Sequence, residues 1–394
     1  MKNKFLIYFI FFTSFSYLVG CAVTPSSGKR DIVLMSEEEE KSIGAREDPK
    51  IVKQFGGVYK DAKVAAYVQA LGNRLAAASE LPDIGWTFTV LNSDEVNAFA
   101  IPGGFAYVTR GLMALAENEA ELAGVIAHEI GHITALHSSA RQAGGFYAGL
   151  GAMAAGLFLG QTGAEVGNYL SRGLLQTYSR EQEFEADSLG VRYLSRTGYN
   201  TQAMATFLAK MQANTQLRNK MFGRPENRVE QNSFFASHPR TSDRVTRAIR
   251  EASITRSNNK LGKVDYMEIL NGMIYGGDHE QGVIRGRDFI HPALRFRFSV
   301  PYGFRLINNP GSVVASGPEG AMIQFDMDFK PYKGKMNEYL QNVWAAKARM
   351  LSMERITVNG MDGATGTAQT RRRDGIFDLR FVAIQQNSQR IFRL

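Results

Sequence analysis

Residues 128–132 read His-Glu-Ile-Gly-His, and this pentapeptide constrains the chain more than any other segment. Its surroundings have helical character, so the two histidines lie four residues apart on one helix face, where two imidazoles can bind one zinc ion. Glu129 follows the first histidine and can reach a metal-bound water as a general base. The pattern predicts His128 and His132 as zinc ligands and Glu129 as catalytic base. The alternative is a helix with two histidines and an ordinary surface glutamate.

The amino terminus is typical of a secretory signal, because two lysines precede an apolar stretch at residues 5–12. Leu18-Val19-Gly20-Cys21 resembles the lipobox of bacterial lipoproteins, which predicts a signal peptide at residues 1–20 and a lipid anchor on Cys21. Ala22 after the cysteine resembles the sorting pattern of Gram-negative lipoproteins and favours the outer membrane, facing the periplasm. Cys21 is the only cysteine, so an intramolecular disulfide and a thiolate-rich metal site are excluded. The alternative is a buried structural cysteine.

Composition bounds the class of protein. A hydrophobic fraction of 44% in 394 residues fits a globular chain of about two domains. The net charge of +8 is a mild basic bias, suited to an anionic lipid surface. Basic residues are scattered apart from Arg371-Arg372-Arg373, without interleaved aromatic residues, so a nucleic-acid partner is not expected. The sequence does not determine an oligomeric state.

Hydrophobic periodicity divides the chain. Polar residues 21–40 are predicted as a tether, and residues 41–255 as the domain that carries the pentapeptide. That domain has predicted helices at 61–78, 181–197 and 203–216, a strand at 86–91, and two strand pieces at 97–108 around a Pro-Gly-Gly turn. Asn118 is predicted to cap the pentapeptide helix, with Glu121 completing a capping box.

A polar stretch at residues 254–262 is predicted as a domain boundary. After it, residues 263–394 show strand patterns at 294–300, 321–329 and 377–384, and an amphipathic helix pattern at 337–353. The predicted fold class is therefore α+β: a mainly helical domain with a small β-sheet, followed by a smaller α+β domain of unknown role.

Residues 142–164 carry no charge and are rich in glycine and alanine. Their length suits a membrane span, and two G-x-x-x-G patterns occur within them. Glycine lowers helix stability, however, so we favour a mobile segment beside the active site over a membrane span.

A zinc site needs a third protein ligand, with a fourth position left for water. His137 lies nine residues after His128, on the opposite face of a continuous helix, and is interpreted as a surface or supporting histidine. Glu183 and Asp187 lie four residues apart and would repel each other on a buried face. A metal on Glu183, with Asp187 accepting an N–H bond from a ligand histidine, would resolve that cost. The alternative is an exposed acidic helix face.

Three segments together resemble the HtpX and CAAX-prenyl-protease type of zinc metallopeptidases. They are NAFAIPGGFAYVTRGL at residues 97–112, HEIGH at 128–132, and E-x-x-x-D from Glu183 to Asp187. The resemblance covers residues 36–251 and is nearest to the periplasmic branch that includes the β-barrel assembly-enhancing protease. It implies a zincin-type fold, one zinc ion on His128, His132 and Glu183, Glu129 as base, and Asp187 behind a ligand. Neither the membrane helices of the first type nor the tetratricopeptide repeats of the second are recognisable, so no natural substrate is implied.

Residues 237–244, Ser-His-Pro-Arg-Thr-Ser-Asp-Arg, extend the resemblance. It implies that His238 approaches the metal from a loop as a fourth ligand or gate. It also makes Arg244 a candidate partner for charge that develops on the substrate. The alternatives are a loop histidine and an arginine at a helix start.

The predicted function is zinc-dependent endopeptidase activity in the cell envelope. The strand residues Asn97, Ala98, Phe99 and Ala100 are predicted to hold an extended substrate by strand addition, which would select unfolded or misassembled envelope proteins. Two alternatives stay open. One is a non-proteolytic or latent assembly factor that binds envelope proteins, and the other is a membrane-embedded protease that uses residues 142–164 as a span.

Overall fold

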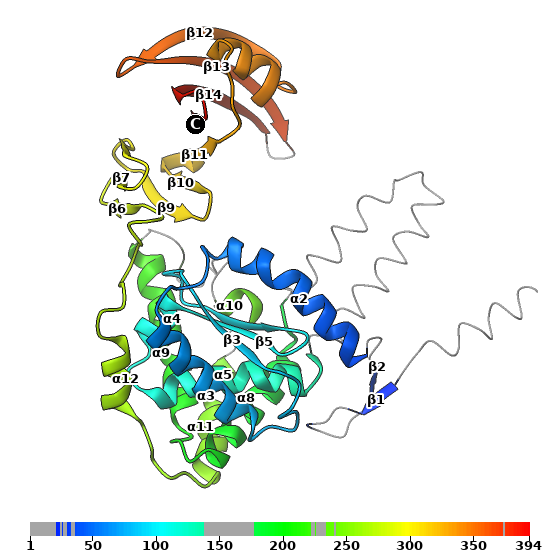
Figure 1. Cartoon of the computed structure of the whole chain (residues 1–394). Coiled ribbons are helices and arrows are strands. Elements are labelled where there is room, and N and C mark those ends of the chain that lie inside the picture. The colour runs from blue at the N-terminus through cyan, green and yellow to red at the C-terminus, as the bar shows by residue number, and fades with distance from the viewer. Residues whose placement is uncertain are drawn as a thin grey trace, which may run out of the picture. The chain divides into compact units, whose positions relative to one another are not determined.

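The computed structural model in Figure 1 describes residues 21–23, 26, 30–32, 36–137, 177–221, 225, 234–239, 242–372 and 375–394. The chain divides into two compact units, Met1–Gly276 and Gly277–Leu394. The predicted signal peptide and residues 142–164 lie outside the described residues. In the part that is described, no helix is both long and apolar enough for a bilayer crossing.

The first unit is mainly helical. Its helices are α2 (Glu37–Gln54), α3 (Ala62–Ala76), α4 (Arg110–Leu115), α5 (Glu119–Thr134), α8 (Arg180–Arg196), α9 (Ala203–Met221), α10 (Phe234–Ser237), α11 (Ser242–Ile254) and α12 (Lys263–Leu270). Strands β3 (Thr87–Leu91), β4 (Ala98–Ile101) and β5 (Phe105–Thr109) form one sheet, and β1 (Cys21–Val23) pairs with β2 (Arg30–Ile32) in a separate ribbon. The predicted helices and strands of this domain are confirmed, with ends shifted by a few residues.

The three-stranded sheet has the order β3-β5-β4. Strands β3 and β5 run parallel, with Val90 opposite Val108, and β4 pairs antiparallel with β5. The predicted Pro-Gly-Gly turn joins β4 to β5, and Gly103 and Gly104 have φ angles of 86° and 84°, which L side chains rarely adopt. Because β5 lies between the other two strands, β4 lies at an edge of the sheet.

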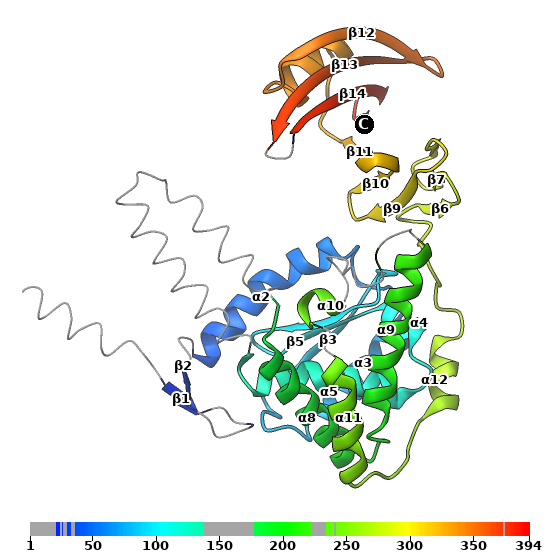
Figure 2. The ribbon, with the colours of Figure 1, turned by 180° about the vertical axis from the view of Figure 1, so that it is seen from behind.

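Helices cover both faces of this sheet (Figures 1 and 2). On one face, Ile51 of α2 and Phe55, which caps the end of that helix, pack against Phe99 and Tyr107. On the other face, α3 and α5 share the main core of the unit, which includes Val68 and Val108. The pentapeptide helix thus lies against the sheet from which a substrate strand is predicted.

Helix α5 is buried along its whole length, from Glu119 to Thr134. A helix that is enclosed on all sides must satisfy its own ends, and the Asn118 side chain accepts a hydrogen bond from the Glu121 backbone. The predicted cap is confirmed. The capping box is not, because the Glu121 carboxylate accepts instead from the backbone N–H of Glu117 at 2.8 Å.

Two predicted boundaries differ from the structure. The acidic run at the end of the predicted tether is the first turn of α2, capped reciprocally by Ser36 and Glu39, because carboxylates stabilise a helix amino terminus. The contact boundary between the units lies after Gly276 rather than at residues 254–262. The reason is α12, whose Tyr266 is fully buried and donates a hydrogen bond to the carbonyl of Met113.

The second unit consists largely of antiparallel strands. They are β6 (Val283–Arg285), β7 (Asp288–His291), β8 (Phe296–Ser299), β9 (Arg305–Asn309), β10 (Ser312–Ser316), β11 (Met322–Asp328), β12 (Met350–Val358), β13 (Met361–Arg372), β14 (Gly375–Asn387) and β15 (Arg390–Arg393). The first three form a small sheet, and the other seven form a sheet with the order β12-β13-β14-β15-β11-β10-β9. With the mainly helical first unit, this confirms the α+β class.

The amphipathic helix predicted at 337–353 is largely wrong. Helix α13 covers only Met336–Tyr339, a short π-helix follows at Leu340–Trp344, and a 3₁₀ turn lies elsewhere at Pro318–Gly320. Residues from Met350 onward form β12, in which Met353 pairs with Gly366 of β13. Long-range pairing with β13 therefore overrides the local helical pattern.

Candidate metal centre

Helix α5 presents His128 and His132 toward one point. The two side chains are at most 1% exposed, and their Nε2 atoms lie 3.0 Å apart. Asp187 lies 2.9 Å from Nδ1 of His128, which places the imidazole proton on Nδ1 and leaves a lone pair on Nε2. Two lone pairs that face each other at this distance repel unless a cation or a proton lies between them.

Helix α8 supplies the carboxylate. Ser179 and Gln182 cap its start reciprocally, and Glu183 sits one residue further on, inside the first turn. Two glycines allow α5 and α8 to approach closely. A Cβ on Gly131 would lie 3.1 Å from the carbonyl oxygen of Ala186, and a Cβ on Gly190 would lie 3.3 Å from the backbone nitrogen of His128. Larger residues at either position would push Glu183 away from the histidine pair.

The donor atoms of His128, His132, Glu183 and His238 all lie within 4.8 Å of one another. Nδ1 of His238 lies 3.2 Å from His128 Nε2 and 3.0 Å from Glu183 Oε1. The Glu183 oxygens lie 3.6 Å and 3.4 Å from Nε2 of His128 and His132. Zinc bonded to nitrogen and oxygen at about 2.0–2.2 Å in a tetrahedron needs ligand atoms about 3.3–3.6 Å apart. The five separations given above lie within about 0.3 Å of this range, and the remaining pair, His132 and His238, lies within 4.8 Å.

The electrostatics of these groups suit a cation. Burial holds the pKa of His132 well below its ordinary value, so the imidazole is neutral and can act as a ligand. Burial alone would raise the pKa of Glu183, but the neighbouring His238 and Arg244 hold it well below its usual range. The carboxylate is therefore ionised in a site that excludes water, which is a costly arrangement unless positive charge is close.

Asp187 and Arg244 form the layer behind the ligands. The Arg244 Nε and Nη2 atoms donate to the two oxygens of Asp187 at 2.9 Å and 2.8 Å, and its Nη1 contacts Oε2 of Glu183. Burial opposes ionisation of Asp187, yet Arg244 holds its pKa below the usual value. With Glu129, three carboxyl groups face one guanidinium, so a divalent cation would balance the site.

Glu129 and His238 lie next to each other at the ligand set. Glu129 is 1% exposed, and its Oε1 lies 3.4 Å from Nε2 of His238. The ring of His238 stacks on Phe234, with centroids 4.3 Å apart and an interplanar angle of 13°. His238 thus lies beside the other three candidate ligands, with Glu129 on the far side of its ring.

The predicted substrate residues lie along β4. Ala98, Phe99 and Ala100 belong to this edge strand, and Asn97 precedes it. All four side chains are buried. The backbone N–H of Phe234 donates to the carbonyl of Val96 at 3.2 Å, so the segment that carries His238 borders the start of the strand. The side chain of Cys21 is outside the described residues.

Sequence reasoning missed the position of His137. It was expected on the opposite helix face, yet it is 4% exposed and its Nδ1 lies 2.9 Å from Nδ1 of His132. Helix α5 ends at Thr134, and Leu136 has a φ of 56°, so the chain turns back and helical spacing no longer applies. Of the two interpretations, the supporting histidine fits this position and the surface histidine does not.

Tyr178 was also missed. Its ring stacks on His132 with centroids 3.6 Å apart and an interplanar angle of 17°. No local pattern signals this contact, because Tyr178 precedes α8 and reaches His132 only through the packing of α8 on α5. The tyrosine ring restricts the orientation of a ligand imidazole.

Comparison with known proteins agrees with this geometry. Residues 62–252 match the profile of Peptidase family M48. The chain is 32% identical to the β-barrel assembly-enhancing protease of Escherichia coli (strain K12) over 174 residues, which are 41% of this chain and 36% of that protein. It is 30% identical to the protein of the same name from Yersinia pestis over 233 residues, which are 55% of this chain and 45% of the relative.

A eukaryotic relative extends over more of the chain. The mitochondrial metalloendopeptidase OMA1 of Schizosaccharomyces pombe is 26% identical over 253 residues, which are 62% of this chain and 71% of that protein. The chain spans only about a third of the Escherichia coli relative. The profile match contains both metal-site helices and the segment around His238. Residues 62–252, within the first unit, are therefore similar to Peptidase family M48.

Proposed function

We propose that this chain is a zinc-dependent endopeptidase that hydrolyses unfolded or misassembled proteins of the bacterial cell envelope. The observation that carries the proposal is the convergence of donor atoms from His128, His132, Glu183 and His238 within 4.8 Å. The similarity to Peptidase family M48 and the relatives named as proteases support it. A set of three imidazoles and one carboxylate, without thiolate, is suited to zinc.

His128, His132 and Glu183 would hold the ion. Zinc, when bound, would lower the pKa of water and polarise the scissile carbonyl. Their burial keeps bulk water from the ligands, and Asp187 fixes the orientation of His128 through its 2.9 Å contact.

Glu129 is the proposed general base. Its carboxylate borders the fourth position, 3.4 Å from the ring nitrogen of His238. There it can take a proton from the attacking water and later deliver it to the amine nitrogen as the C–N bond breaks. The hydrogen bonds of Arg244 run to Asp187, to Glu183 and, at 3.4 Å, to the carbonyl of Pro239. These contacts favour a positioning role for Arg244, and its action on substrate charge stays a prediction.

Strand β4 is the proposed support for the substrate. An edge strand can pair its backbone with an extended peptide, and a folded protein rarely offers such a peptide. Backbone pairing with β4 would therefore select unfolded or misassembled chains without a sequence-specific contact.

The envelope location rests on the amino-terminal sequence. We propose that Cys21 carries the lipid anchor and that the mature protein faces the periplasm from the outer membrane. Replacement of Cys21 by alanine should move the protein from the membrane fraction to the soluble fraction. A Cys21→Ala protein that stays in the membrane fraction would contradict lipid anchoring and favour a span.

The first experiment replaces Glu129 with glutamine. The variant should keep one zinc per chain, because His128, His132 and Glu183 are intact, and lose casein cleavage by at least about 100-fold. Glu181→Gln, at an exposed glutamate of α8, is the matched control and should keep both properties. If the Glu129→Gln protein digests casein as fast as the parent, the assignment of the base is wrong.

A latent or non-proteolytic assembly factor is the second candidate. It is favoured by His238, whose Nδ1 lies 3.2 Å from Nε2 of His128 and 3.0 Å from Oε1 of Glu183, where it would compete with water or a substrate carbonyl for a bound zinc. An inactive parent with an active His238→Ala variant would identify a latent protease. Zinc-loaded proteins that are inactive with either residue would favour the assembly factor.

A further inference from the structure

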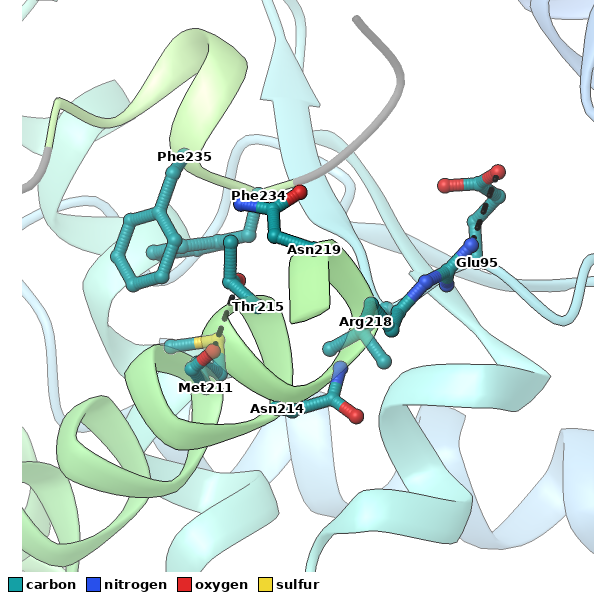
Figure 3. Close-up of a pocket in the computed structure, with 9 residues that line it drawn as sticks. Glu95, Met211, Asn214, Thr215, Arg218, Asn219, Phe234 and Phe235 are labelled. Carbon is teal, nitrogen blue, oxygen red and sulfur yellow. Dashed lines mark hydrogen bonds and ion pairs between the residues drawn. The ribbon is translucent and has the colours of Figure 1, made fainter. Parts of the chain in front are cut away.

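A small pocket adjoins the metal centre and is not used by the proposed mechanism (Figure 3). Its lining residues come from the chain before β4, from α9 and from α10: Glu95, Val96, Met211, Asn214, Thr215, Arg218, Asn219, Phe234 and Phe235. Apolar atoms form most of its wall, although five of the nine lining residues are polar or charged, and Arg218 pairs with Glu95 at 4.0 Å on one side. The pocket is therefore an apolar hollow with a charged border.

Phe234 joins this pocket to the reaction site. Its ring stacks on His238 with centroids 4.3 Å apart and lies 5.9 Å from the ring of His128. Its backbone N–H is bonded to the carbonyl of Val96, immediately before Asn97 and β4. The pocket thus lies one aromatic ring away from the ligands, at the start of the strand along which a peptide would pair.

The size of the hollow limits what can enter. Its volume is about 20 Å³, little more than the space that one water needs. A methyl group fits such a space, whereas an isopropyl group or a phenyl ring is too large for it. Met211, Phe234 and Phe235 would remove an entering apolar group from water.

We propose that this pocket is a specificity subsite that accepts the methyl side chain of alanine from a residue near the scissile bond. This inference rests on the proposed peptidase function and names the class of peptide that the site prefers. Thr215 and Phe235 are the specificity-determining residues, because one borders the hollow from α9 and the other from α10.

The test measures peptide binding without cleavage. Zinc-loaded Glu129→Gln protein is titrated with fluorescein-labelled casein decapeptides in which each position in turn is Gly, Ala, Val or Phe. At one peptide position, alanine should give about 10-fold tighter binding than phenylalanine, and valine should bind more weakly than alanine. Thr215→Leu, which fills the hollow, should abolish this preference, and Phe235→Val, which enlarges it, should improve Phe binding about 10-fold. Ala213→Leu, on the exposed side of α9, is the control that leaves the preference unchanged.

The outcomes separate the two proposals. A binding profile without any preference overturns the subsite. So does a preference that changes by less than twofold in both pocket variants, provided that these variants have the melting temperature of the Glu129→Gln protein. If Phe235→Val fails to fold, the partly exposed Thr215→Leu decides the result alone. A preference that responds to the variants, together with a parent that cleaves none of the peptides, supports the pocket and overturns the peptidase function.

Discussion

Replacement of Arg244 by methionine tests how the site tolerates its buried carboxylates. The guanidinium is 2% exposed, bridges both oxygens of Asp187 and contacts Glu183. Methionine keeps much of the side-chain volume but leaves two carboxylates facing each other without the guanidinium. Breaking a buried ion pair from one side costs about 3–5 kcal/mol. For a unit of this size, that loss lowers the melting temperature by roughly 6–20 °C.

The loss should depend on pH and on metal. The pKa of Asp187 is lower in the folded protein than in the unfolded chain, so the ion pair stabilises the fold fully above about pH 4. That contribution is lost as the pH falls through the folded pKa. The stability gap between parent and variant should therefore be widest near neutral pH and narrow below about pH 4. Bound zinc should also narrow it, because the cation compensates Glu183.

Thermal melts of the metal-free and zinc-loaded proteins at pH 7 and pH 3.5 would measure these effects. Arg250→Met, at an exposed arginine of the same helix, is the matched control and should melt within about 2 °C of the parent. A metal-free Arg244→Met protein that loses less than about 1 kcal/mol at pH 7 would refute the reasoning. So would a gap that is equal at both pH values.

Three further predictions concern the metal. His137→Ala should raise the zinc dissociation constant, measured by chelator competition, about 10- to 100-fold, because His132 loses its 2.9 Å partner. Replacement of the exposed His279 by alanine is the control. An unchanged dissociation constant in His137→Ala would contradict the supporting role of His137. Gly131→Val should lower both melting temperature and zinc content, since its side chain meets the backbone of α8; full zinc occupancy would show that α8 can shift freely. Chelation with EDTA should lower the melting temperature of the parent, and zinc should restore it, whereas equal melting temperatures would indicate that the site does not bind zinc in the folded state.

Much of the site was readable from local patterns. Four-residue spacing placed His128 with His132 on α5, and Glu183 with Asp187 on α8. Both pairs follow from the helical repeat, which needs only local backbone geometry. The Pro-Gly-Gly turn was equally local, since Gly103 and Gly104 adopt positive φ angles.

Other features were beyond local reasoning. His137 reaches His132 because the helix ends at Thr134 and Leu136 adopts a left-handed conformation. A leucine in the sequence does not predict that conformation. Residues 350–353 belong to the segment with the amphipathic helical pattern, but pairing with β13 makes them part of strand β12. The polar residues 254–262 suggested a boundary, yet burial of Tyr266 binds the next helix to the first unit.

The sequence alone determined which side chains could serve as ligands and base, because helical periodicity sets their relative directions within each helix. Only the tertiary structure decided that the two helices approach closely enough to bring Glu183 to the histidines, since that distance depends on Gly131, Gly190 and the packing between α5 and α8. The same holds for Arg244, whose position behind Asp187 depends on how α11 packs against α8. Packing between distant segments depends on the whole core, so it cannot be predicted from a local sequence pattern.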